Sequence, residues 1–190
     1  MRALVLIALL AGARASAQSG LIGGRPPAPA RRVVGRGART IVEEHGAKLW
    51  AVRPGGGRLL LDGELPQNDA LQTSATMSPF FGRRDLLDVA VQTMWSNGFG
   101  GEDRVEHYIV RVGAHGDSLA CRFTGEEGGG MEDRNHRTIP TINKLSDEPL
   151  IFELVASASS TGAISAGGPR ATTMRYQIGP SGMCRAQPFR

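Results

Sequence analysis

Short runs of alternating apolar and polar residues, separated by turn-forming residues, are the main pattern of this chain. Between 150 and 156, Leu150, Phe152 and Leu154 fall on every second residue, and the same spacing of large apolar side chains recurs between 171 and 178. This period of two is typical of a β-strand with one buried face. The segment 85–95 fits that period better than the helical one, although a helix is an alternative there. Turns rich in Gly and Pro, such as 54–57 and 179–182, separate the runs.

The pattern predicts an all-β fold class, either an antiparallel β-sandwich or a small barrel-like domain, in a single domain over 41–190. The segments 68–82 and 125–136 are expected to be loops, the first with at most one helical turn. The expected strands are 48–53, 58–65, 85–95, 105–112, 118–124, 150–156, 171–178 and a short strand that holds Cys184.

Residues 1–17 have the pattern of a secretory signal peptide. Arg2 supplies a positive start, an apolar run follows, and Ala15-Ser16-Ala17 fits the small-residue cleavage pattern. The apolar run is shorter than the roughly 20 residues that a membrane-spanning helix needs. We therefore expect cleavage after Ala17, export to the periplasm or the extracellular space, and no transmembrane helix after processing.

Residues 18–40 are rich in Gly, Pro and Arg and contain no acidic residue. Such a segment cannot bury much apolar surface, so the sequence predicts a disordered tail that acts as a spacer. Tethering to an anionic envelope surface and removal as a pro-segment are alternatives.

The charge balance of the chain differs between its two parts. The formal net charge is +4, but the five arginines of the tail and the two of the leader leave 15 basic against 18 acidic residues in 41–190. The folded part therefore lacks the cationic excess typical of nucleic-acid-binding domains, and no specific nucleic acid is expected as a partner. Twenty arginines against two lysines indicate a GC-rich, bacterial genome.

Cys121 and Cys184 are the two cysteines of the chain. In an oxidising compartment they are expected to form a disulfide, which would close a loop of about 64 residues and add roughly 4 kcal/mol to stability. Two buried free thiols are the alternative. Neither cysteine belongs to a Cys-x-x-Cys motif, so a redox role has no support.

Gly116-Asp117-Ser118-Leu119 resembles the signature of the GDSL esterases, and Asp133-Arg134-Asn135-His136 resembles their Asp-x-x-His element. The resemblance covers these two tetrapeptides. It implies a serine hydrolase in which Ser118 attacks an ester carbonyl, His136 accepts the serine proton and Asp133 orients the histidine. In that family the two elements lie far apart in an α/β domain, whereas here 15 residues separate Ser118 from Asp133. We interpret the first tetrapeptide as a turn and keep the esterase as an alternative.

A group of acidic residues surrounds a run of three glycines. Carboxylate and backbone oxygens are the ligands that Ca²⁺ prefers, so a metal site is an alternative here. The spacing lacks the Asp-x-Asp-x-Asp-Gly order of a known calcium loop, and a solvated acidic loop is the main interpretation. The four residues are Glu126, Glu127, Glu132 and Asp133.

Trp95 and Phe99 flank the predicted turn 96–101 and are candidates for an aromatic platform that binds a sugar or a peptide. Apolar strand positions nevertheless favour core packing for most aromatic residues of the chain. The aromatic residues expected in the core are Trp50, Trp95, Phe123 and Phe152.

These patterns predict an exported, non-catalytic β-domain with a binding or interaction role and no cofactor. The expected partner is an envelope component or another secreted protein. A secreted serine hydrolase and a small outer-membrane β-barrel are the alternatives. The barrel would fit the mature length, but the aromatic content of 5% is low for the aromatic girdles of such barrels.

Overall fold

The computed structural model of the protein describes residues 31–54, 57–65, 72–96, 100–114, 116–131, 134–161, 171–179 and 184–188. Within these ranges the chain forms twelve strands and one short 3-10 helix. The elements are β1 (Arg31–Arg36), β2 (Ile41–His45), β3 (Lys48–Arg53), β4 (Gly57–Asp62), β5 (Gln72–Pro79), η1 (Phe80–Gly82), β6 (Leu86–Ser96), β7 (Gly100–Arg111), β8 (Ser118–Met131), β9 (Arg134–Asp147), β10 (Leu150–Thr161), β11 (Ala171–Ile178) and β12 (Cys184–Pro188).

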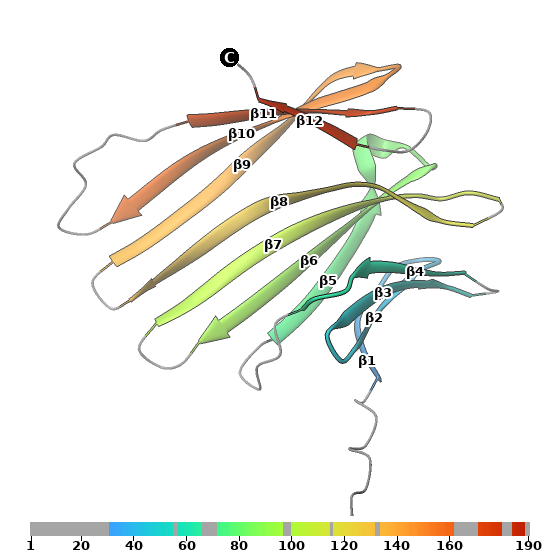
Figure 1. The fold of residues 1–190 in the computed structure, drawn as a ribbon, viewed down its shortest axis with the longest axis horizontal. Helices are drawn as coiled ribbons and strands as arrows, with labels where there is room; N and C mark the ends of the chain where they lie inside the picture. Colours follow the sequence, from blue (N-terminus) through green and yellow to red (C-terminus); the bar gives the residue numbers. More distant parts are fainter. Residues whose placement is uncertain are drawn as a thin grey trace, which may run out of the picture.

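The strands form two antiparallel sheets, which confirms the predicted fold class (Figure 1). The small sheet has the order β1-β2-β3-β4, and the large sheet has the order β12-β11-β10-β9-β8-β7-β6-β5. The large sheet is open, with β5 and β12 as its edge strands. No helix in the described ranges is both long and apolar enough to cross a membrane. The predicted signal peptide 1–17 lies outside the described residues.

The large sheet curls back over itself instead of lying flat. Residues 127–131 of β8 pair with 134–138 of β9, and the described ladder between these strands covers only that stretch. Cys121 of β8 and Cys184 of β12 form the predicted disulfide, with Cα atoms 4.8 Å apart. Four strand spacings in a flat sheet would separate them by about 19 Å. Strand β12 therefore lies over one face of β8.

The curl encloses the first of two hydrophobic cores. Phe123 of β8 and Phe152 of β10 meet in this core from opposite layers, with ring centroids 5.4 Å apart. Phe80 of η1 packs against both rings. The buried members of this core are Phe80, Leu86, Ile109, Ala120, Cys121, Phe123, Leu150, Phe152, Leu154 and Ile178.

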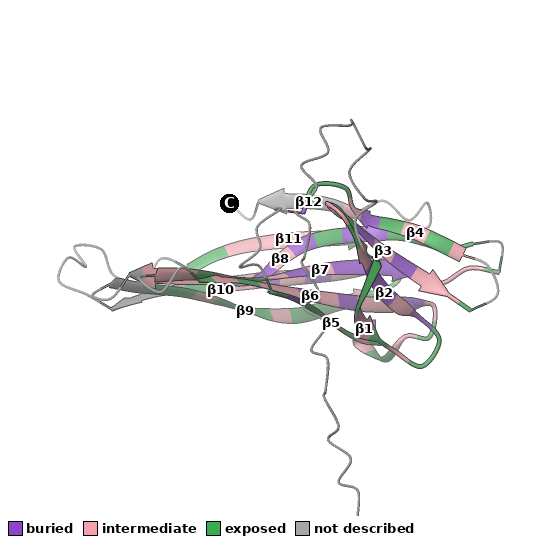
Figure 2. Cartoon of the chain, turned by 90° about the horizontal axis from the view of Figure 1, so that it is seen from below, coloured by how far each residue is buried: buried purple, intermediate pink, exposed green. Residues whose placement is uncertain are grey.

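The second core lies between the small sheet and the other face of β6 and β7. Because side chains alternate along a strand, Val89 and Val91 face the small sheet while Leu86 faces the curl. Figure 2 shows buried positions along β3 and β7. Packing on both faces of the central strands agrees with the predicted sandwich. The buried members are Val42, Leu49, Ala51, Leu61, Leu65, Val89, Val91, Tyr108 and Val110.

Regular structure begins ten residues earlier than the sequence predicted, because β1 lies within the expected tail 18–40. Arg31 Nε donates to Glu43 at 2.7 Å, and Arg32 Nη2 donates to Glu44 at 2.6 Å. Glu43 is buried, so its charge requires a cationic partner. These ion pairs with β2 hold β1 in the small sheet, so the prediction of disorder is wrong for residues 31–36. Residues 18–30 of the tail lie outside the described residues.

The segment 68–82 was predicted to be a loop, and this prediction is wrong for its described part. All eight residues of β5 pair with β6. The inward side chains of β5 are Thr73, which is buried, and Ala75 and Met77, which are half-buried. Of these three residues only Met77 is large and apolar, so β5 lacks the apolar alternation on which the strand prediction depends. The expected single helical turn is present as η1.

The glycine-rich segment 125–136 was also predicted to be a loop, whereas most of it is strand. β8 continues through the three glycines to Met131, and β9 begins at Arg134. Glycine weakens a strand that stands alone. Here the glycines pair with β7 on one side and β9 on the other, so two ladders hold them in extended form.

Candidate functional site

Ser118 and His136 of the esterase alternative lie near opposite ends of β8. Ser118 begins β8, where it pairs with Arg111, while His136 of β9 pairs with Gly129 near the other end of β8. Eleven residues of extended strand separate these two positions, which corresponds to roughly 36 Å. Asp133 lies outside the described residues. Ser118 and His136 are therefore too far apart to act as nucleophile and base.

Of the segment 116–119, Gly116 and Asp117 lie in the connection between β7 and β8, while Ser118 and Leu119 begin β8 and pair with β7. Asp117 Oδ2 lies 2.9 Å from Nε of Arg53, and Asp117 Oδ1 accepts a hydrogen bond from the Gly113 amide at 3.4 Å. Gly116 has a φ of 141°, which favours glycine. The aspartate and the glycine of the tetrapeptide therefore shape a connection.

The acidic residues of the calcium alternative do not gather in the described part of the chain. Glu126 and Glu127 are consecutive on β8, and Glu126 forms an ion pair with Arg137 of β9. Glu132 and Asp133 lie outside the described residues. Within the described residues, no group of three or more His, Cys, Asp or Glu side chains is placed to hold a metal ion.

The register of β6 to β9 places one residue of each strand in a single cross-strand row. Trp95 of β6 lies opposite Glu102 of β7. Gly129 of β8 lies between Glu102 and His136 of β9. Directly opposed residues on neighbouring strands project from the same face. These four residues, which we call the Gly129 row, therefore share one face of the large sheet.

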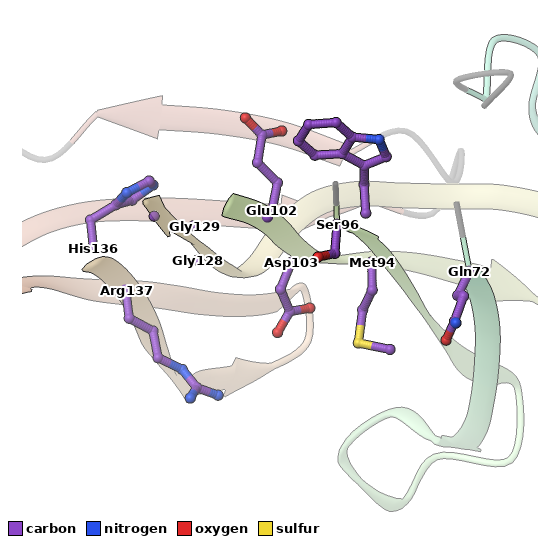
Figure 3. Close-up of a pocket in the computed structure, with 12 residues that line it drawn as sticks. Gln72, Met94, Ser96, Glu102, Asp103, Gly128, Gly129, His136 and Arg137 are labelled. Atoms are coloured by element: carbon purple, nitrogen blue, oxygen red, sulfur yellow. The ribbon is translucent and has the colours of Figure 1, made fainter. Parts of the chain in front are cut away.

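A second row lies beside the first and projects from the other face. Figure 3 shows Glu102 and His136 on one side of the strands and Asp103 and Arg137 on the other. Residues from both rows line a hollow of about 590 Å³. The second row consists of Met94, Asp103, Gly128 and Arg137.

Gly129 is the one residue of the row without a side chain. A Cβ atom at this position would lie 3.1 Å from Cε1 of His136 and 3.4 Å from Cγ of Glu102. Both side chains thus lean over the glycine from the neighbouring strands. The absence of a β8 side chain here lets Glu102 and His136 approach each other over the strand.

Among the described residues, Glu102 and His136 of the Gly129 row have no side-chain partner, whereas charged groups of the adjacent row are paired. Asp103 accepts a hydrogen bond from Gln92 at 3.0 Å, and Arg137 forms an ion pair with a carboxylate of β8. Glu102 and His136 are exposed, and within the described ranges neither has a hydrogen-bond or ion-pair partner. Both side chains are therefore accessible to solvent.

The aromatic residues expected in the core divide into two groups. Phe123 and Phe152 are buried, with 3% and 0% of their surface exposed, as predicted. Trp50 and Trp95 are only half-buried, so the core prediction is wrong for them. Trp95 lies instead at one end of the Gly129 row. Phe99, the second residue of the predicted aromatic platform, lies outside the described residues.

Sequence reasoning missed a polar cluster that joins the two sheets. The hydroxyl of Tyr108 donates to Asp62 Oδ2 at 2.8 Å. Nη2 of Arg122 lies 2.9 Å from the same oxygen, and Nε of Arg122 lies 3.1 Å from Glu106 Oε2. Alternation along β7 places Glu106 and Tyr108 on one face. The partner of Tyr108 on β4, Asp62, is distant in the sequence, so no local pattern indicated the cluster.

The environment of this cluster shifts two pKa values. Burial disfavours the charged form of Asp62, but hydrogen bonds from the Glu64 amide and the Tyr108 hydroxyl, together with the charge of Arg122, hold the pKa of Asp62 below its usual value. Burial and the hydrogen bond to Asp62 raise the pKa of Tyr108. The cluster is internally paired, so we assign it to the contact between the sheets.

Comparison with known proteins gives no relative: no family model matches the chain, and neither a curated protein nor a solved structure is significantly similar to it. The fold thus defines the class of protein, an open β-protein of two antiparallel sheets with an exposed polar row across β6 to β9.

Proposed function

We propose that this chain is an exported, non-catalytic binding domain whose ligand contacts the Gly129 row. The observation that carries the proposal is the uncommitted state of Glu102 and His136 beside the half-buried Trp95. A few convergent polar groups beside an aromatic ring are typical of ligand-binding surfaces. An envelope component or another exported molecule is the partner.

Export has separate support from the sequence and from the cysteines. The leader pattern of residues 1–17 directs a chain out of the cytoplasm. A disulfide between Cys121 and Cys184 fits an oxidising compartment, where such bonds form and persist. Bacterial origin and the site of export, periplasm or medium, are part of the proposal.

Cell fractionation tests this function with the full chain. We expect the processed protein, beginning at Gln18, outside the cytoplasm and bound to washed envelopes. Trp95→Ala should leave the exported protein largely unbound, because it removes the ring at the end of the Gly129 row. Trp50→Ala is the matched control, since Trp50 lies on β3 of the small sheet and should leave envelope binding unchanged.

Two results would contradict the proposal. One is a full-length, unprocessed product that stays in the cytoplasm with free thiols. The other is envelope binding that is absent, or equal for the wild type and Trp95→Ala, when both proteins give the same circular dichroism spectrum.

A further inference from the structure

On the basis of the proposed binding role, we propose that the ligand of the Gly129 row is a neutral carbohydrate chain. One sugar ring stacks on Trp95, and hydroxyl groups of the chain hydrogen-bond to Glu102 and His136. This ligand class belongs to the binding site proposed above, and it is inferred from the exposed side chains of Glu102 and His136 and from the ring of Trp95.

The aromatic end of the row suits a sugar ring. Trp95 is half-buried, which limits the motion of its side chain, and it lies directly opposite Glu102. An indole ring offers a large apolar surface at a low cost in conformational entropy. The C–H face of a pyranose ring is also apolar, so stacking removes both surfaces from water while the hydroxyl groups point outward.

The two polar side chains match the donors and acceptors of a polyol. The Glu102 carboxylate accepts hydrogen bonds and can take two neighbouring hydroxyl groups at once. The His136 imidazole carries both a donor and an acceptor when neutral. Both side chains are exposed and without partners in the described ranges, so a bound sugar replaces water and breaks no internal ion pair.

The shape of the row suits an extended ligand. Trp95 and His136 are three strand spacings apart, which corresponds to about 14 Å. Gly129 leaves the middle of this distance free of a β8 side chain. A linear sugar chain that crosses the strands therefore reaches all three side chains.

Two other classes of ligand would contact fewer side chains of the Gly129 row. A cationic group would account for Trp95 and Glu102 through cation–π and ionic attraction, but it leaves His136 without a role. An extended peptide that adds to a sheet needs an unpaired strand edge. The backbone of β8 is paired on both sides at Gly129, so no such edge is available there.

Fluorescence titration of the full chain tests the carbohydrate assignment. The chain has two tryptophans, so Trp50→Phe leaves Trp95 as the single reporter. We titrate this variant with short linear oligosaccharides of glucose, xylose, mannose and N-acetylglucosamine, and in parallel with tetramethylammonium chloride. At least one oligosaccharide should give a saturable change in emission, and its affinity should not depend on salt because the ligand is neutral.

Variants of the row then test the roles of the side chains by calorimetry. Trp95→Ala should weaken binding of the active oligosaccharide about tenfold or more, and Glu102→Gln about threefold to tenfold. Gly129→Ala should also weaken binding, because its Cβ enters the space between His136 and Glu102. Gly63→Ala, which meets no atom within 4 Å, should bind as the wild type does.

These experiments distinguish failure of the carbohydrate assignment from failure of the proposed binding function. Saturable binding of tetramethylammonium without any sugar binding would overturn the carbohydrate class and leave the binding function intact. Sugar binding that Trp95→Ala and Glu102→Gln leave unchanged would place the ligand elsewhere and overturn the inference. Binding of no oligosaccharide also overturns it, while the envelope fractionation decides the binding function independently.

Discussion

Glycine has two distinct roles in β8, and both depend on what a side chain would meet. At Gly129 the missing Cβ leaves space that the side chains of Glu102 and His136 occupy, which brings these two groups of the proposed site together. At Gly125 the missing Cβ leaves room for the ring of His107. That ring stacks on Phe123 at 4.9 Å, which ties the glycine to the core of the curl.

We expect Gly125→Ala to destabilise the protein by about 1–3 kcal/mol, the usual cost of overpacking. A Cβ at this position would lie 2.5 Å from Cδ2 and Nε2 of His107, so the ring must move. Moving it also disturbs the 2.9 Å contact between Nδ1 of His107 and Asp88. Urea unfolding measures the change, with Gly63→Ala as the control. Equal destabilisation of the two variants would contradict the argument.

At the scale of elements, polar contacts hold the small sheet against the large one. Asp62 ends β4, while Tyr108 and Arg122 lie on β7 and β8. The carboxylate accepts from the tyrosine and pairs with the arginine, whose guanidinium lies 5.2 Å from the centroid of the Tyr108 ring. The second hydrophobic core supplies the apolar part of the same contact.

The lowered pKa of Asp62 predicts a contribution to stability that depends on pH. The folded protein binds the proton of this carboxyl less readily than the unfolded chain does, so the contribution is fully present above the usual value of 3.8 and is lost as pH falls through the lower folded value. Asp62→Asn should therefore be less stable than the wild type near neutral pH, and the difference should shrink on acidification. Thermal unfolding across this range measures it, and a constant difference would contradict the assignment.

At the scale of the whole molecule, one covalent bond holds the curl of the large sheet closed. Cys121 and Cys184 are 63 positions apart in sequence, and their strands are four places apart in the sheet order. The core that the bond spans contains Phe123, Phe152 and Ile178. The disulfide thus joins the two layers that enclose this core.

Cys184→Ser should lower stability by about 4 kcal/mol, because the unfolded chain regains the entropy that the closed loop removes. For a chain of this size, that loss corresponds to a fall in Tm of roughly 10 °C. Differential scanning calorimetry measures it. The double variant Cys121→Ser/Cys184→Ser controls for a free thiol and should unfold near the single variant. A wild-type mass that does not rise by two hydrogens on reduction would contradict the pairing.

Much of the fold could be predicted from local sequence, because a strand with one buried face has a visible period of two. The segments 150–156 and 171–178 show this period and lie within β10 and β11. The prediction failed where that signal is absent: β5 has small and polar inward residues, and the glycines of β8 have no side chains to alternate. The disulfide followed from cysteine count and the expected compartment.

The candidate site could be predicted only in part. The sequence singled out Trp95 and His136 separately, the first as an aromatic platform and the second as a catalytic base, and it passed over Glu102 as a ligand group. These residues become neighbours through the register of four strands, with Gly129 between two of them. Local pattern thus determined the strands and their inward faces, since alternation is a property of one segment. Tertiary structure alone decided which side chains lie opposite one another, because register depends on pairing between segments distant in the chain.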